Sequence, residues 1–367
     1  MQIGYLTQLV RYHLAHRLNL GNPLPDNITL SITRTCQSAC LTCDCGKDTR
    51  EGRVNAQQEL SLEELYRITD SIDWHVRFLT ISGGEPSLAK TFESFAVDFA
   101  SRIHPEYVTI PTNALTPCLL DRVESILRAT MNLRTLWHVN VSVDGIGANH
   151  DQLRGVEGNF GKCIKILEGL LEFRKRYPYL RVGVHTVVSK YNIGTIWKIM
   201  KYFKQYPLDN HISEIAEERY ELGTMGRDMT PCDRYTDVTP CLKEALGNKR
   251  EGKLRRSLRL AYYDFVKEWC QHQNHQPVPC MAGIASAHIT ETGKLVSCCT
   301  RWSNMGLMGD LREHNYDFKK AWFSEQADRV RASIKNRECA CPLASAAYSS
   351  LLCSPKSLLK ITKNCIE

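Results

Sequence analysis

The sequence lacks the features that mark membrane-spanning, secreted and nucleotide-binding proteins. It contains no run of about 18 apolar residues, so an ordinary transmembrane helix is not expected. Its first residues lack the apolar core and the small-residue cleavage site of a signal peptide. Neither a Rossmann G-x-G-x-x-G fingerprint nor a P-loop is present, which removes the two commonest phosphate-binding motifs.

A large excess of charge of one sign is also missing. The formal net charge is +7, and such a mild excess suits an acidic redox partner, an anionic substrate or a membrane surface, or serves solubility alone. The densest basic stretch, 248–256, is interrupted by Glu251 and leads into a predicted helix, so we expect no nucleic-acid binding. The 16 cysteines, without a secretion signal, predict thiols and metal clusters in a reducing cytoplasm rather than disulfides.

Three of these cysteines, Cys36, Cys40 and Cys43, form a C-x₃-C-x₂-C run. Three thiolates ligate three irons of one [4Fe–4S] cube and leave the fourth iron without a protein ligand. An open iron binds and activates a small molecule, whereas a closed four-cysteine cluster only transfers electrons. The alternative is a zinc site, but zinc normally takes four ligands and no second pair lies nearby. The run therefore predicts an open iron–sulfur site.

From Asn27 onward, strand and helix patterns alternate, which implies βαβ units with a parallel sheet and right-handed crossovers. The polar residues that break these patterns all follow predicted strands, as the functional residues of α/β barrels do. We therefore predict a partial (β/α)₆ TIM-like barrel over 27–219 rather than an open doubly wound sheet. The predicted strands are 27–33, 77–83, 107–113, 136–143, 180–189 and 211–216, and the helices are 61–72, 91–102, 118–129, 161–177 and 195–205.

The rest of the chain is expected to form three further regions. Residues 1–26 hold an amphipathic helix over 5–18, which we expect to cap the barrel; a helix lying on a membrane surface is the alternative, with no Trp and few basic residues to favour it. Residues 220–275 read as a helical linker, irregular over 221–252. Residues 276–367 are predicted to form a small α+β domain.

A second motif decides what the open iron binds. The predicted second strand ends in Gly83, Gly84, Glu85 and Pro86, and this string after a cysteine triplet and a helix resembles the radical S-adenosylmethionine (radical SAM) superfamily. In that family the open iron of a [4Fe–4S] cluster chelates the methionine amino and carboxylate groups of SAM, and the Gly-Gly-Glu-Pro strand end binds the amino group. The resemblance assigns Gly83, Gly84 and Glu85 to SAM.

The resemblance extends to two later strand ends. The string His-Val-Asn-Val-Ser-Val-Asp-Gly and the following loop are similar to the fourth strand of relatives with auxiliary clusters. It implies that Ser142 lies near the SAM carboxylate, that Arg154 pairs with that carboxylate, and that Asp144 is catalytic and faces the substrate. Thr112 and Asn113 resemble a Thr-Asn-Gly strand end that lines the SAM pocket. A simple turn at Asp144 and a surface ion pair of Arg154 are the structural alternatives.

The C-terminal cysteines resemble the auxiliary-cluster domains called SPASM and twitch. Cys280 and Cys298 flank a predicted hairpin with a Glu-Thr-Gly turn, and together with Cys339 and Cys341 they imply a second [4Fe–4S] cluster without an open iron. The full SPASM cysteine pattern is absent, so one auxiliary cluster is expected, and a structural zinc site is the alternative. Other cysteines that remain open as ligands are Cys299, Cys353 and Cys365.

As the resemblance implies, an acidic one-electron donor of the flavodoxin or ferredoxin type reduces the first cluster, and SAM then yields a 5′-deoxyadenosyl radical that abstracts a substrate hydrogen. We expect oxidation of a small molecule, such as a sugar, cyclitol or lipid precursor. Only 35 residues precede Cys36, too few for a leader-peptide-binding domain, so a peptide-modifying maturase or an epimerase is the second hypothesis. A non-catalytic iron–sulfur electron carrier or zinc protein is the third, and would not cleave SAM.

Overall fold

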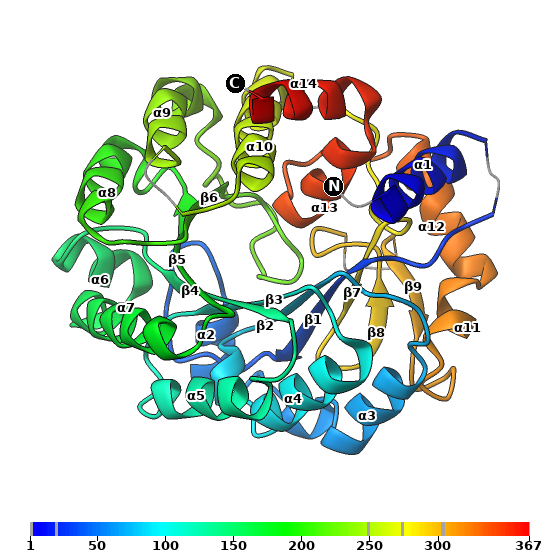
Figure 1. The fold of residues 1–367 in the computed structure, drawn as a ribbon, viewed down its shortest axis with the longest axis horizontal. Coiled ribbons are helices and arrows are strands. Elements are labelled where there is room, and N and C mark those ends of the chain that lie inside the picture. Colours follow the sequence, from blue (N-terminus) through cyan, green and yellow to red (C-terminus); the bar gives the residue numbers. More distant parts are fainter. Residues whose placement is uncertain (1–2, 19–20, 248–249, 273–274, 302–304, 367) are drawn as a thin grey trace.

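The computed structural model describes residues 3–18, 21–247, 250–272, 275–301 and 305–366 of the chain. The first two residues of the predicted basic stretch, 248–249, lie outside these ranges. The described residues form one nine-stranded sheet in the order β6-β5-β4-β3-β2-β1-β7-β8-β9, and helices cover its outer side (Figure 1).

The first six strands are parallel neighbours and form the predicted partial barrel, whose sheet does not close. Each predicted strand and crossover helix is present within a few residues of its predicted bounds, which confirms the fold class. The strands are β1 (Asn27–Thr33), β2 (Phe78–Gly83), β3 (Tyr107–Thr112), β4 (Leu136–Ser142), β5 (Leu180–Val188) and β6 (Asn210–Ile215). The helices between them are α2 (Cys45–Arg50), α3 (Leu62–Asp70), α4 (Phe92–Ile103), α5 (Leu119–Ala129), α6 (Ala148–Arg154), α7 (Asn159–Arg176) and α8 (Ile196–Tyr202).

A local sequence signal fixes where α3 begins. At the start of α3, the Ser61 hydroxyl accepts a hydrogen bond from the Glu64 backbone N–H, and the Glu64 carboxylate accepts one from the Ser61 N–H. This reciprocal capping box satisfies two of the backbone donors that a helix start leaves without partners.

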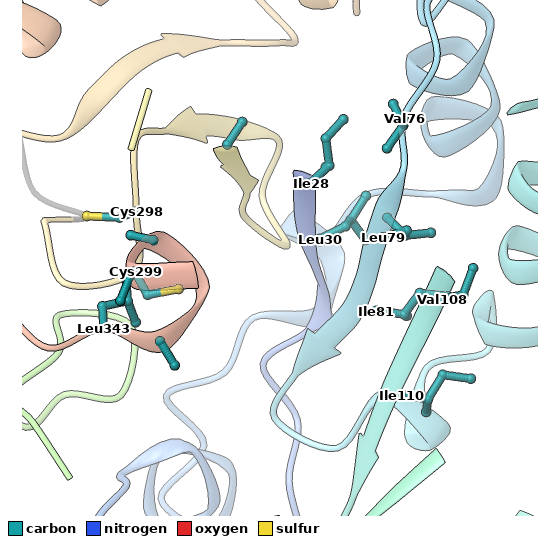
Figure 2. Packing of buried hydrophobic residues seen from close by; sticks show 14 of the residues in the cluster. Ile28, Leu30, Val76, Leu79, Ile81, Val108, Ile110, Cys298, Cys299 and Leu343 are labelled. Carbon is teal, nitrogen blue, oxygen red and sulfur yellow. The ribbon is translucent and has the colours of Figure 1, made fainter. Parts of the chain in front are cut away.

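The sheet presents one apolar and one polar side because successive strand residues point to opposite faces. Figure 2 shows buried aliphatic side chains along β1, β2 and β3, which pack toward the helices. The alternate positions of β4 carry His138, Asn140 and Ser142, all buried. Gly183 of β5 faces the same interior, where a Cβ atom would lie 2.0 Å from Asn210 Oδ1 and 2.4 Å from Asn140 Oδ1. The concave face of the barrel is therefore polar.

The C-terminal strands extend the barrel sheet instead of forming one of their own. Strand β7 (Ser286–Ile289) pairs in parallel with β1, and β8 (Lys294–Val296) and β9 (Leu307–Asp310) follow in antiparallel order. The predicted hairpin turn is confirmed, with Gly293 at a φ of 85° that favours glycine. Helices α11 (Phe318–Trp322) and α12 (Glu325–Lys335) pack on β9.

The expectation of irregular structure over 221–252 is wrong for a large part of that range. Helix α9 (Cys232–Ala245) runs through it and packs against α8 and α10 (Lys253–Gln271). Tyr235, Thr239 and Leu242 recur at helical spacing and are buried. Their burial offsets the cost of about 3 kcal/mol for a proline such as Pro240 inside a helix.

The expectation of free or metal-bound cysteines without disulfides is also wrong at one pair. Cys232 at the start of α9 and Cys270 near the end of α10 form a disulfide, with Cα atoms 4.9 Å apart. The two residues are 38 positions apart in the sequence, and only the packing of α9 on α10 brings them together.

The N-terminal helix α1 (Ile3–Leu18) is present as predicted. Its Tyr5, Leu9, Tyr12 and Ala15 are buried, and it packs against α13 (Ala344–Cys353), which leads into α14 (Pro355–Ile366). No helix in the described ranges has both the length and the apolar character needed to cross a bilayer.

Candidate active site

The three-cysteine loop lies at the carboxyl end of β1 and is fixed by backbone hydrogen bonds from two other loops. The Ala39 N–H donates to the Arg154 carbonyl at 2.8 Å, and the Leu41 N–H donates to the Leu153 carbonyl at 3.0 Å. The Asp44 N–H donates to the Leu222 carbonyl at 2.8 Å. The end of α6 and the segment after β6 therefore hold the three-cysteine loop in place. The loop itself forms no helix or strand over residues 34–44.

The glycines at the end of β2 allow this strand to lie against the backbone that leads into the three-cysteine loop. The Gly84 N–H donates to the Thr33 carbonyl at 2.7 Å, which continues the pairing of β1 with β2 beyond the strand ends. A Cβ atom on Gly84 would lie 2.3 Å from the Thr35 carbonyl oxygen and 2.5 Å from that of Arg34. The motif therefore brings β2 against the backbone that leads into Cys36.

Glu85 follows the two glycines, and its buried carboxylate is held by four hydrogen-bond donors. It accepts hydrogen bonds from the Thr112 hydroxyl at 3.0 Å, the Asn113 N–H at 2.7 Å, and the Ser87 hydroxyl and N–H. Burial raises the pKa of Glu85, and these hydrogen bonds oppose the shift. Asn113 also donates from Nδ2 to Ser38 Oγ at 3.1 Å, so the same residue orients the carboxylate and the cluster loop.

Asp144 and Arg154 form a buried ion pair in the same region. Arg154 Nε lies 2.8 Å from Asp144 Oδ2, without the alignment of a hydrogen bond, and Arg154 Nη1 donates to Cys40 Sγ at 3.8 Å. The other Asp144 oxygen accepts the Val187 N–H at 2.8 Å. Burial acts to lower the pKa of Arg154, but Asp144 and Cys40 outweigh it and raise that pKa. The Arg154 guanidinium therefore contacts Asp144 and Cys40. Because Arg154 is buried, it does not form the surface ion pair that was the structural alternative.

One cavity of about 200 Å³ collects all the site residues predicted for the barrel. These are Cys36, Cys40, Cys43, Gly83, Gly84, Glu85, Thr112, Asn113, Ser142, Asp144 and Arg154. They come from the ends of four strands and from the end of α6, as expected for an α/β barrel whose chemistry lies at the carboxyl ends of its strands.

The far wall of this cavity carries four charged or titratable side chains from β5, β6 and the following loop. His185 Nε2 lies 3.4 Å from Glu214 Oε2, and Arg219 Nη2 lies 2.9 Å from Glu217 Oε1. Burial raises the pKa of Glu217 to about 7, and the Arg219 charge limits the shift. Glu217 Oε2 is buried and has no hydrogen-bond partner. The wall is therefore polar, and a bound molecule can donate a hydrogen bond to Glu217 Oε2.

Sequence reasoning missed His185. A polar residue in a largely apolar strand was the available signal, because alternate positions of a barrel strand face the interior. Tyr220, which follows Arg219 in the sequence, is about half exposed and does not line the cavity.

The four predicted auxiliary cysteines are brought together on the other side of β1. Burial raises the pKa of the Cys280 thiol to about 12, with Cys298 and Cys339 adding to the shift. Burial likewise raises the pKa of Cys341, with Cys298 and Cys280 among the contributors. Thr300 Oγ1 lies 3.2 Å from Cys298 Sγ and 3.8 Å from Cys341 Sγ. Figure 2 shows Cys298 beyond β1, away from β2 and β3.

The alternative cysteines are placed elsewhere. Cys365 donates to Ser257 Oγ at 3.3 Å, and Cys353 lies at the end of α13, where Asp26 and not another cysteine acts on its pKa. Cys299 lies next to Cys298, but its Sγ is 2.8 Å from His288 Nδ1.

Neither set of thiols is as compact as the ligands of a zinc site. Within the described ranges, the one group of metal-ligating atoms that all lie within 4.8 Å of one another is that of Glu221, His288 and Cys299. Neither cysteine set is that compact, whereas tetrahedral zinc with bonds of about 2.3 Å holds its thiolates about 3.8 Å apart. A cube of iron and sulfur fills the space between its ligands and holds them farther apart. Neither cysteine set therefore has the compactness of a closed tetrahedral zinc site.

The compact group is itself fully hydrogen-bonded. His288 Nε2 lies 2.8 Å from Ser31 Oγ, whose hydroxyl donates to Glu221 Oε1 at 3.1 Å, and Nδ1 faces Cys299. Both ring nitrogens have partners, so these four buried residues form a polar chain linking β1, β7 and the loop after β6 to the auxiliary cysteines.

A parallel barrel with an open three-cysteine site at its strand ends defines a class of iron–sulfur enzyme. Residues 30–203 match the model of the Radical SAM superfamily, so the chain contains a radical SAM domain and the family resemblance is confirmed. The cofactors of this domain are a [4Fe–4S] cluster and SAM.

Curated relatives include the sporulation killing factor maturation protein SkfB of Bacillus subtilis, 31% identical over 157 residues, which are 42% of this chain and 35% of SkfB. GTP 3',8-cyclase 2 of Pseudomonas aeruginosa is 26% identical over 327 residues, covering 81% of this chain and 87% of that protein. The chain spans about half or less of several relatives it matches, with 35%, 53% and 42% of their lengths covered in three cases.

Solved structures share the fold. Native anSMEcpe with bound AdoMet aligns with a TM-score of 0.58 and 16% identity over 93% of this chain and 97% of that one. Streptococcus suis SuiB bound to S-adenosylmethionine aligns with a TM-score of 0.56 and 16% identity over 89% of this chain and 70% of that one. At these identities the likeness concerns the fold alone.

The Asp144–Arg154 pair yields a stability prediction. Arg154→Gln leaves Asp144 buried without its charge partner, and we expect a loss of about 3–5 kcal/mol in the free energy of unfolding. Arg128→Gln, at an exposed helical ion pair, is the control and should change stability by less than about 0.5 kcal/mol. Anaerobic denaturant titrations measure both. The double variant Asp144→Asn with Arg154→Gln should recover part of the loss; no recovery would show that the pair does not carry the effect.

Proposed function

We propose that the protein is a radical SAM enzyme that abstracts a hydrogen atom from a polar small molecule and oxidises it, with a second iron–sulfur cluster held by Cys280, Cys298, Cys339 and Cys341 taking up the electron. The observation that carries the proposal is the convergence of the three-cysteine loop, the Glu85 carboxylate and a charged far wall in one cavity.

The bound cluster and SAM supply a 5′-deoxyadenosyl radical, and the chain's own residues prepare the site for it. Cys36, Cys40 and Cys43 hold the cluster. Glu85 presents a preorganised, buried carboxylate for an ammonium group, since its donors fix its orientation before SAM arrives. Arg154 lies beside Cys40, where a positive charge stabilises a thiolate ligand.

A polar substrate is supported by the wall of His185, Glu214, Glu217 and Arg219. A hydroxyl- or amine-bearing molecule can donate to Glu217 Oε2, which otherwise stays buried and unsatisfied at a cost of about 1–3 kcal/mol. Asp144 accepts the Val187 N–H of the strand that carries His185, and it pairs with Arg154, which contacts Cys40. Its predicted catalytic contact with the substrate therefore remains part of the proposal.

Peptide modification is the second candidate function. The names of two relatives favour it: SkfB is a maturation protein, and Mycofactocin maturase MftC of Mycolicibacterium smegmatis is 28% identical over 185 residues. A solved neighbour with a TM-score of 0.53, SuiB of Streptococcus suis, is described as bound to its precursor peptide SuiA.

The test is anaerobic reconstitution followed by reduction with dithionite in the presence of SAM. About eight irons per chain and formation of 5′-deoxyadenosine are expected for two cubes. About four irons with turnover would overturn the second cluster, and intact clusters without SAM cleavage would favour an electron carrier. Extract fractions separated by ultrafiltration then distinguish the substrates: stimulation of 5′-deoxyadenosine formation by the small, protease-resistant fraction supports a small molecule, and protease-sensitive stimulation supports a peptide.

A further inference from the structure

Helix α1 has two apolar sides, and only one of them is used by the fold. Tyr5, Leu9, Tyr12 and Ala15 pack into the core. A second row, four residues apart and therefore along one side of the helix, remains in solvent. Its members are Leu6, Val10, Leu14 and Leu18, with exposed fractions of 37%, 55%, 36% and 59%.

The C-terminal helix α14 lies beside α13, the helix on which α1 packs. It begins two residues after α13, which packs against both α1 and α14 (Figure 1). His13 Nδ1 lies 3.0 Å from the Cys353 carbonyl oxygen at the end of α13, which fixes α1 against this corner. Leu359 of α14 is 74% exposed.

The charge around the exposed row is of one sign. Residues 3–18 and 355–366 contain no Asp or Glu, while the whole chain has 40. Their five basic residues are Arg11, Arg17, Lys356, Lys360 and Lys363. Lys360 is paired with Asp264 of α10. At the end of α12, Lys335 and Arg337 add positive potential next to His16.

We propose that α1 and α14 form a peripheral docking face for an anionic lipid bilayer. Leucine and valine side chains that project from a helix lying flat enter the boundary between headgroups and acyl chains, and Lys and Arg beside them meet anionic headgroups. The sequence favours a helix that caps the barrel and leaves a helix on a membrane surface as the alternative. The structure shows that α1 packs into the core through one apolar side and exposes the other to solvent.

The proposed face contains none of the residues that line the cavity, so docking through α1 is independent of SAM cleavage.

Sedimentation of the reconstituted holoenzyme with vesicles tests the proposal. Vesicles of phosphatidylcholine alone and of phosphatidylcholine with phosphatidylglycerol are compared at low and moderate salt. We expect binding to the anionic vesicles that weakens with salt, and a loss of at least about tenfold in the double variant Val10→Glu with Leu18→Glu. Met131→Glu, an equally exposed apolar residue after α5, is the control and should bind as the unaltered protein does.

Circular dichroism and 5′-deoxyadenosine formation check that both variants are folded. Equal, salt-independent binding to both vesicle types, or no binding to either, would overturn the proposal. Concentration-dependent self-association that Val10→Glu with Leu18→Glu abolishes, without vesicle binding, would identify a second copy of the chain as the occupant and also overturn it.

Discussion

Replacing Cys40 with alanine is expected to abolish 5′-deoxyadenosine formation. Cys40 is the central residue of the three-cysteine loop, it is half-buried, and Arg154 donates a hydrogen bond to its sulfur. Loss of one of only three ligands leaves a cube held by two thiolates. Because removal of outer-shell partners alone lowers metal-site function about 10–100-fold, we expect a loss of more than about a hundredfold here.

The variant should also separate the two cysteine sets. Iron content is expected to fall from about eight to about four per chain, since Cys280, Cys298, Cys339 and Cys341 are untouched. Cys118→Ala is the matched control, because Cys118 is exposed at the start of α5 and lines no part of the cavity. Retention of SAM cleavage in Cys40→Ala would refute the assignment of the loop as the open cluster site.

Gly84→Ala is expected to have a comparably large effect without removing any ligand. The added methyl group would lie 2.3 Å from the Thr35 carbonyl oxygen and 2.5 Å from that of Arg34, and both are backbone atoms leading into the cluster loop. Neither can move without shifting β1 or the loop, so we expect a destabilisation of about 1–3 kcal/mol and failure to assemble the first cluster.

Iron content and the denaturation midpoint measure this effect. Gly161→Ala is the control, because a Cβ at this position in α7 meets nothing within 4 Å, and the change should stabilise the helix by up to about 1 kcal/mol. If Gly84→Ala took up iron and cleaved SAM as the unaltered protein does, the close packing of β2 on the cluster loop would not matter for function.

Local patterns in the sequence predicted most of the barrel. The capped start of α3 at Ser61 and the turn at Gly293 are short-range features, so the residues that produce them are adjacent in the chain. Helix α9 escaped prediction because Pro231 and Pro240 obscured its periodicity, and its stability comes from packing against α8 and α10. The Cys232–Cys270 disulfide escaped for the same reason, since it depends on that packing.

By itself, the sequence determined the chemistry that the site can perform. The spacing of Cys36, Cys40 and Cys43 limits a cube to three protein ligands, and the Gly-Gly-Glu-Pro string indicates what the fourth iron binds. These are properties of a few neighbouring residues. The tertiary structure alone decided that Arg154 pairs with Asp144 beside Cys40, that His185 joins Glu217 on the far wall, and that α1 leaves an apolar row in solvent. Each of these three features depends on contacts between elements that are distant in the sequence. Such contacts are determined by tertiary packing and not by the spacing of residues along the chain.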